Sequence, residues 1–555
     1  RDCLLSRGLG DVYKRQKINS TIAKFMAAGA ILFGSVACTG DYIDYNKNPH
    51  EPDLDQMLPD DYLFSALLLN MQDVMMPEQE NFSQYVDCLM PGGFSGYVAD
   101  SNLGTGWSGR FATYNPSEAW LRIPFADFYD KFYPNYFQLK EQCEDEVYLS
   151  LAELYRICTM LRVTDTYGPI PYSQVGVNNA LKSGYDSQEQ VYKKMFEDLD
   201  NIIDVLTTYS AQNFNSSGDR IYGGNTKSWA KFANSVKLRM AMRIVYVNES
   251  LAKQKAEEAV NSEIGVMTVS TDGAYHKVVD HNPWERFMPN WGDARISADL
   301  VCYMNGYSDP RREVYYDKST FATKGAYKGT EDYVGLRRGI RQGQYNSWSQ
   351  GYSCMKVTVS DNMLIFPASE VTFLRAEGAL RGWNMGGTAK ALYEEAVSLS
   401  FDERGVSGAS TYLTNSTGLP TVYKDPLKGE DGQKYDYSGS TNSTITVAWD
   451  DAADFETKLE RIITQKWIAI FPSTMEAWSE YRRTGYPKLM PAMHNLSDGV
   501  VDDAEGARRL SYPADEYREN GENLDAAVLA LTKESSNKKG DTMATRIWWD
   551  CKPAK

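Results

Sequence analysis

The residues that could perform acid–base, nucleophilic or metal chemistry are scattered along this chain. The four histidines, His50, His276, His281 and His494, belong to no HExxH, Gly-x-Ser-x-Gly or Cys/His arrangement. The 74 acidic residues supply many possible carboxylate pairs for a glycosidase, and this abundance makes the signal uninformative. The pattern therefore argues against a Ser or Cys hydrolase and against a histidine-ligated metalloenzyme.

Two acidic clusters have the oxygen ligands that calcium prefers, Asp450, Asp451 and Asp454 in one and Asp502 and Asp503 in the other. Neither follows the loop pattern of an EF-hand, so we interpret both as solvated loop charge. No cofactor is predicted, and a structural calcium ion remains a possibility without assigned ligands. The cysteines show no zinc-type spacing and are compatible either with disulfides or with buried free thiols.

The overall charge and the aromatic content limit the kind of ligand. The formal net charge is −16, so nucleic acid and anionic lipid are poor partners. Aromatic residues make up 12% of the chain, and many lie among Gly, Asn and Ser rather than in apolar-periodic segments. Rings held in polar loops are suitable surfaces for stacking against a sugar.

The N-terminal region has the order of a bacterial lipoprotein signal. Lys17 and Lys24 precede a short apolar run that ends at Cys38, the expected lipidation site. The run is too short to span a bilayer, which takes about 20 residues. We interpret residues 1–16 as a sequencing artefact, 17–37 as the signal peptide and 38–555 as one exported, lipid-anchored domain.

Hydrophobic periodicity predicts helices that hold this domain together. The Tyr167–Pro171 segment predicts a firm helix stop, and Asp186-Ser187 offers an N-cap. Two helix pairs with short turns suggest tetratricopeptide-like packing. The helices are expected at 62–71, 146–163, 188–207, 227–247, 251–261, 367–382, 388–400, 456–471 and 473–483.

Three long segments, 72–145, 265–366 and 401–455, are expected to be irregular. Loops of this length inside a compact unit are usually functional. The fold class is therefore predicted as mainly α, with tetratricopeptide-like helix pairs and a large loop-rich half.

Short motifs distributed along the chain resemble those of the SusD/RagB family, the surface lipoproteins with which Bacteroidota capture nutrients. Each motif is short, but they occur in the expected order over almost the whole chain. The motifs are Asn46–Pro52, Asp165–Pro171, Trp229–Arg243, Asp309–Arg311, Phe373–Gly378, Gln465–Trp467 with Glu476–Trp478, Tyr481–Pro487 and Ile547–Asp550.

The resemblance implies a helical domain with four tetratricopeptide-like pairs and a non-enzymatic role. In this role the lipoprotein is the lid of a SusC-like TonB-dependent transporter, to which it delivers an oligosaccharide. Asp41 and Asp44 are similar to the acidic flank that directs such lipoproteins to the outer face of the outer membrane. Polar and Trp residues within these motifs are expected to pack or to form buried hydrogen bonds and ion pairs, namely Asn234, Arg239, Arg243, Glu377, Trp478, Trp548 and Trp549.

Similarity to glycan binders implies that aromatic rings in the variable loops build the ligand platform. The predicted aromatic contacts come from the loop before the second long helix and from the middle of the chain, with polar side chains around the rings. These candidates are Tyr97, Trp107, Tyr114, Trp284, Trp291 and Trp348, together with Asn102, Arg110 and Asn346. Two alternatives stay open: a RagB-like peptide-capturing subunit and a surface glycoside hydrolase.

Overall fold

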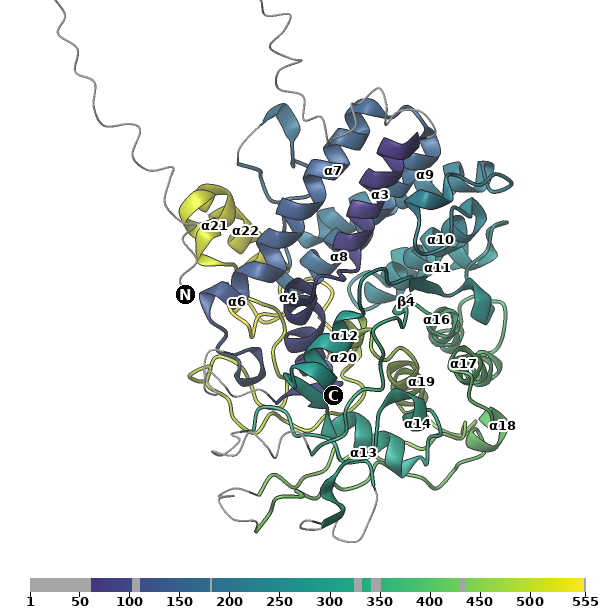
Figure 1. The fold of residues 1–555 in the computed structure, drawn as a ribbon, viewed down its shortest axis with the longest axis vertical. Helices are drawn as coiled ribbons and strands as arrows, with labels where there is room; N and C mark the ends of the chain where they lie inside the picture. Colours follow the sequence, from purple (N-terminus) through teal and green to yellow (C-terminus); the bar gives the residue numbers. More distant parts are fainter. Residues whose placement is uncertain are drawn as a thin grey trace, which may run out of the picture. The chain divides into compact units, whose positions relative to one another are not determined.

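A computed structural model describes residues 61–101, 110–179, 182–323, 332–340, 351–429 and 436–553. Residues 60–555 form one compact unit. The structure is mainly helical and holds two small antiparallel sheets, β1–β3 and β2–β4 (Figure 1). The predicted fold class is therefore confirmed.

The N-terminal half is a stack of helices that pack on their neighbours in the order α3, α7, α8, α9, α10 and α11. The chain then continues to α16 and α17, which pack on each other and on α19 (Figure 1). The predicted helix pairs are thus present. The bounds are α3 (Tyr62–Met75), α7 (Phe128–Gln142), α8 (Glu146–Tyr167), α9 (Gln188–Thr208), α10 (Thr226–Arg243), α11 (Glu249–Asn261), α16 (Ala368–Leu380), α17 (Ala389–Glu403), α19 (Phe455–Ala469) and α20 (Thr474–Thr484).

The ends of these helices follow their local sequence. Asp145 caps α8 by accepting a hydrogen bond from the backbone N–H of Val147 at 2.8 Å. The helix ends one turn later than predicted, at Tyr167, where Gly168 takes φ of 89°, a conformation that favours glycine. At the start of α9, Ser187 forms a capping box with Gln190.

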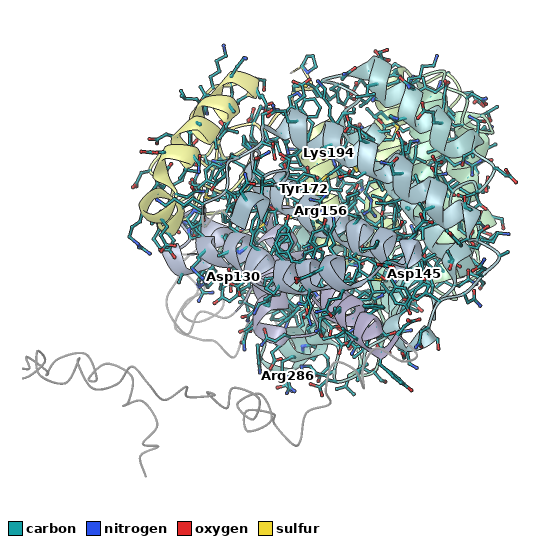
Figure 2. The ribbon with its side chains drawn as sticks, turned by 90° about the horizontal axis from the view of Figure 1, so that it is seen from above. Asp130, Asp145, Arg156, Tyr172, Lys194 and Arg286 are labelled. Atoms are coloured by element: carbon teal, nitrogen blue, oxygen red, sulfur yellow. The ribbon has the colours of Figure 1, made fainter. Side chains whose placement is uncertain are left out.

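The contact between α8 and α9 combines ion pairing with ring stacking. Arg156 of α8 donates to the carboxylate of Asp198 on α9 at 3.1 Å. Its guanidinium also lies 4.3 Å from the centroid of the Tyr172 ring, and Figure 2 shows these two side chains beside each other. Lys194, one turn before Asp198, pairs with the same carboxylate at 2.8 Å.

The helix α7 was not predicted, because its segment was expected to be irregular. Phe128, Phe132, Tyr136 and Leu139 are buried at helical spacing, and they pack toward α3 and α8. Pro134 and the many rings give this segment weak intrinsic helix propensity. Tertiary burial of one apolar face is therefore what holds it helical.

The loop-rich half contains short elements around the two sheets. Most of 265–366 and 401–455 is irregular in the described residues, as predicted. Two further helices, α13 and α22, were not predicted. The bounds are α4 (Glu80–Ser83), α5 (Pro91–Phe94), β1 (Val98–Asp100), α6 (Glu118–Arg122), β2 (Ala274–His276), α12 (Pro283–Glu285), β3 (Ala294–Ile296), α13 (Ala298–Gly306), α14 (Arg312–Tyr315), β4 (Met363–Phe366), α18 (Ala409–Tyr412), α21 (Ala514–Glu519) and α22 (Gly521–Glu534).

Two further observations concern the cysteines and the possibility of a membrane-spanning helix. All six cysteines of the described ranges are free thiols rather than disulfides, namely Cys88, Cys143, Cys158, Cys302, Cys354 and Cys551. Among the described helices, none combines the length and apolar character that a membrane span requires. The proposed signal peptide and Cys38 lie outside the described residues.

Candidate ligand-binding site

The small sheet β1–β3 brings three distant loops together. Val98 pairs with Ile296 and Asp100 with Ala294, in antiparallel register. Directly after β1, the backbone N–H of Ser101 donates to Asp293 at 2.8 Å, and its hydroxyl donates to Gly292 at 2.7 Å. Ser101, the residue before the 102–109 segment, therefore lies beside the 286–293 turn.

The chain that follows the 341–350 segment contacts β3 of the same sheet. The backbone N–H of Ile296 donates to the carbonyl of Ser353 at 3.1 Å, and Ser353 is the third residue after the 341–350 segment. The three segments that the sequence proposed as ligand loops thus have neighbouring ends. Four of the predicted contacts, Asn102, Trp107, Asn346 and Trp348, fall outside the described residues and stay predictions.

Among the predicted aromatic residues that the structure describes, Trp291 is the one that is open to solvent. Its side chain is 40% exposed. The backbone is fixed, because its N–H donates to the carbonyl of Arg286 at 2.8 Å and Gly292 follows at φ of 74°. A ring that is half exposed on an ordered turn can stack against a ligand at little conformational cost.

Tyr97 and Tyr114 were predicted to contact ligand, but the structure places both in the core. Tyr97 is fully buried, stacks on Trp467 at 5.2 Å between ring centroids, and donates its hydroxyl hydrogen to the Trp467 carbonyl. Tyr114 stacks on Phe94 at 6.0 Å. Burial raises the pKa of both phenols, to about 12 for Tyr114. Neither ring has an exposed face, so the structure assigns both residues to core packing rather than to ligand contact.

Arg110 and Trp284 are also packed more tightly than predicted. Arg110 is 7% exposed and forms an ion pair with Asp100 at 2.5 Å, which closes the base of the 102–109 loop. Trp284 is 5% exposed and lies edge-on to Phe287, with the ring centroids 4.9 Å apart. Arg110 is therefore held against Asp100 by packing and charge, whereas Trp284 lines a cavity.

This cavity, of about 330 Å³, lies between the helical stack and the loop-rich half. Its apolar wall is rich in methionine, a flexible side chain that adapts to irregular shapes. The sequence did not indicate it, because its lining comes from elements far apart in the chain. The lining includes Met75, Met76, Met355, Met363 and Met475, with Arg239, Arg243, Asn282, Trp284 and Glu476 as polar or aromatic members.

A buried ion-pair network forms the floor of this cavity. Arg239 of α10 binds the Glu370 carboxylate through two hydrogen bonds, of 2.8 and 2.9 Å. One turn further along α10, Arg243 contacts Glu476 and Glu480 of α20. The predicted pairing roles of Arg239 and Arg243 are confirmed, and both arginines also line the cavity.

The other residues predicted to pack or pair do so. Asn234 donates to the Ala259 carbonyl at 2.7 Å, which joins α10 to the end of α11. Glu377 accepts hydrogen bonds from Arg381 and Arg483. Trp478, Trp548 and Trp549 are buried. These motif residues therefore stabilise the helical scaffold.

The network predicts a loss of stability in acid. Burial alone would raise the pKa of Glu476, but Arg243, Lys466 and Arg239 outweigh it and lower this pKa to about 2. An unfolded glutamate titrates near 4.3. Because the folded pKa is the lower one, the added stability is present above pH ~4.3 and is lost as the pH falls toward 2, by roughly 3 kcal/mol. Urea unfolding at pH 7, 4.5 and 3 measures the loss, and Glu476→Gln should flatten this pH dependence. An equally steep dependence in the variant would contradict the assignment.

The acidic clusters considered for calcium have local partners. Asp450 and Asp502 accept hydrogen bonds from backbone N–H groups two residues on, and Asp454 caps α19 through the N–H of Thr457 at 2.7 Å. These contacts are those of turn and cap residues. A structural calcium ion stays an untested prediction.

Comparison with known proteins identifies the scaffold. A family model described as SusD-like, "Susd and RagB outer membrane lipoprotein", matches residues 44–550. The chain belongs to the SusD-like family. The predicted resemblance is therefore confirmed over the same span as the motifs. A comparison with curated proteins returned no match.

Solved SusD homologues share the fold over almost their entire length. One from Bacteroides ovatus is 69% identical, covers 89% of this chain and 100% of its own, and has a TM-score of 0.85. One from Bacteroides thetaiotaomicron is 42% identical, covers 88% and 99%, and has a TM-score of 0.81. A chitin-binding homologue from Flavobacterium johnsoniae is 38% identical, with the same coverages and a TM-score of 0.81.

Proposed function

We propose that this SusD-like protein binds an oligosaccharide at the bacterial cell surface, without catalysis. The observation that carries the proposal is that Trp291 is exposed on an ordered turn beside β1–β3, where the described residues Ser101 and Ser353, which flank the other two candidate segments, also lie. An apolar ring face matches the C–H face of a sugar, and polar loop groups suit its hydroxyls. The relative described as chitin-binding supports a carbohydrate ligand.

We further infer that the protein delivers this ligand to a SusC-like TonB-dependent transporter. The family description as an outer membrane lipoprotein supports anchoring through Cys38. A lid that rises and closes over a barrel must remain folded as a unit, and the buried network between α10, α16 and α20 provides that rigidity. Removing the transporter should abolish uptake while the lipoprotein stays folded at the surface.

Trp291→Ala is expected to weaken oligosaccharide binding about five- to tenfold, because one stacked ring contributes on the order of 1 kcal/mol. Isothermal titration calorimetry of residues 39–555 against an oligosaccharide panel that includes chitooligosaccharides measures the effect. Tyr62→Ala is the control, since Tyr62 is 55% exposed at the start of α3, outside the three loops. Product analysis of the same mixtures tests for cleavage.

Each outcome of this titration is informative. Sugar binding that weakens in Trp291→Ala and is unchanged in Tyr62→Ala supports glycan capture at the three loops. Binding of peptides in place of sugars would favour a RagB-like function and contradict the proposal. Cleavage of any ligand would contradict the assignment as a non-enzyme.

A further inference from the structure

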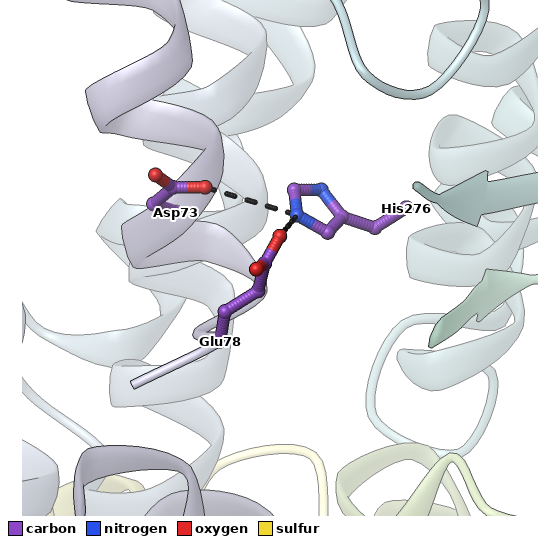
Figure 3. Close-up of side chains that lie close together, drawn as sticks. All are labelled: Asp73, Glu78 and His276. Atoms are coloured by element: carbon purple, nitrogen blue, oxygen red, sulfur yellow. Dashed lines mark hydrogen bonds and ion pairs between the residues drawn. The ribbon is translucent and has the colours of Figure 1, made fainter. Parts of the chain in front are cut away.

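Two carboxylates that are close in the sequence and one distant histidine meet near two residues that line the cavity, Met75 and Tyr275. Asp73 lies on α3, Glu78 precedes α4, and His276 ends β2 (Figure 3). Their ligand atoms lie within 4.8 Å of one another. His276 belongs to no sequence motif, but the structure packs β2 so that this histidine contacts Glu78, from which it is 198 residues distant in the sequence.

The two carboxylates converge on one nitrogen of His276. The Nε2 atom lies 2.9 Å from Oε1 of Glu78 and 3.7 Å from Oδ1 of Asp73. The ring is fully buried, and its Nδ1 atom has no hydrogen-bond partner among the described residues. The polar contacts of this imidazole are therefore made on the side that faces the carboxylates.

Another histidine in the same region shows what makes this cluster distinctive. His281 also has two carboxylate neighbours, but Glu80 lies 3.4 Å from Nε2 and Asp280 lies 3.0 Å from Nδ1. The two carboxylates of His281 are thus on opposite sides of the ring and cannot share an ion with one nitrogen. Of these two histidines, only His276 has two carboxylate oxygens beside the same ring nitrogen, so that three possible metal-ligand atoms surround one point.

The spacing fits a small transition-metal ion. Zinc binds imidazole nitrogen and carboxylate oxygen at roughly 2.0–2.2 Å, so tetrahedral donors are about 3.4 Å apart. The observed 2.9 and 3.7 Å bracket this separation. One imidazole and two carboxylates suit zinc better than calcium, which prefers six to eight oxygen ligands.

The cluster is both fixed and accessible. The Glu78 carboxylate accepts hydrogen bonds from the backbone N–H groups of Val279 and Asp280, each at 3.2 Å, which orients it toward His276. The Asp73 side chain is 39% exposed, so an ion can enter from that side.

Arg220 is the cation that faces these carboxylates in the present structure. Its Nη1 lies 2.6 Å from Oδ1 of Asp73 and 3.5 Å from Oε1 of Glu78, the same two oxygens that face His276. With two carboxylates and one guanidinium, the three side chains keep one negative charge. A divalent ion would exchange with the guanidinium, whose side chain is 23% exposed and can turn toward solvent.

We propose that Asp73, Glu78 and His276 form a binding site for a divalent transition-metal ion, best matched by Zn²⁺, which competes with Arg220. The ion would join α3 to β2. Met75 of α3 and Tyr275 of β2 lie close to these ligands in the sequence and line the cavity, so a bound metal would link the two elements that carry them. This inference is independent of the glycan site.

The test is a calorimetric titration of untagged residues 39–555 with Zn²⁺ after treatment with a chelator. We expect one ion to bind per chain, with affinity at least tenfold weaker in Asp73→Asn and in His276→Gln. Arg220→Gln should bind about tenfold more tightly, because it removes the competing cation. His281→Gln is the matched control and should bind as the parent protein does.

The variants keep the proposal falsifiable if a buried substitution disturbs folding. Asp73 is partly exposed, so Asp73→Asn should fold even if His276→Gln does not. Absence of zinc binding in both the parent protein and Arg220→Gln would overturn the proposal, as would equal zinc affinity in the parent protein and Asp73→Asn.

Discussion

Glu480→Gln is expected to lower the free energy of unfolding by about 3–5 kcal/mol, the usual cost of breaking a buried ion pair by removing one partner. Glu480 is 3% exposed and accepts hydrogen bonds from Arg483 at 2.6 and 2.9 Å. Arg243 and Lys466 lie 3.2 and 3.3 Å away. The amide leaves three buried cations with one carboxylate fewer, and this explains the size of the effect.

Chemical unfolding followed by circular dichroism measures this change. The control is Glu519→Gln, which removes an exposed carboxylate paired with Arg518 and should change stability little. A Glu480→Gln protein as stable as its parent would show that water or other groups replace the lost charge. It would also remove the physical basis for treating α10, α16 and α20 as one rigid unit.

Trp478→Ala is expected to cost about 3–5 kcal/mol, the range measured for large-to-small substitutions of buried aromatic residues. Trp478 is fully buried, and its indole N–H donates to the Ala507 carbonyl at 3.1 Å. The Arg482 guanidinium lies 3.6 Å from the ring centroid and the Phe94 ring 5.1 Å. The substitution removes a ring that joins α20, α5 and the C-terminal segment.

Trp291→Ala provides a matched comparison, because the same atoms are removed from a half-exposed ring. We expect Trp291→Ala to leave the unfolding midpoint nearly unchanged and Trp478→Ala to lower it strongly. Equal effects on stability would contradict the separation between a structural tryptophan in the scaffold and a ligand-facing tryptophan in the loops.

Local sequence signals predicted most of the helical stack correctly. The pairs α10–α11 and α16–α17 and the stop after α8 follow from apolar spacing, caps and the Gly168-Pro169 turn. The helix α7 was missed because its rings and Pro134 give weak propensity, and only contacts with α3 and α8 stabilise it. Intrinsic propensity is a weak signal when tertiary burial decides the outcome.

The candidate ligand residues show where sequence reasoning stops. Tyr97, Tyr114 and Trp291 look alike in the sequence, since each lies among small or polar residues. The structure separates them, because the first two rings stack in the core whereas Trp291 is 40% exposed. Exposure depends on which distant segment covers a ring, and no local pattern contains that information.

The sequence by itself determined the family, the mainly α class and the order of the helices, because periodicity, caps and motifs act over a few neighbouring residues. Tertiary structure decided the cavity, the network around Glu480 and the cluster at His276. Arg243 meets Glu480 across 237 residues, and His276 meets Glu78 across 198. Such contacts form only when separate helices and strands pack, and packing also sets the burial and charge on which their chemistry depends.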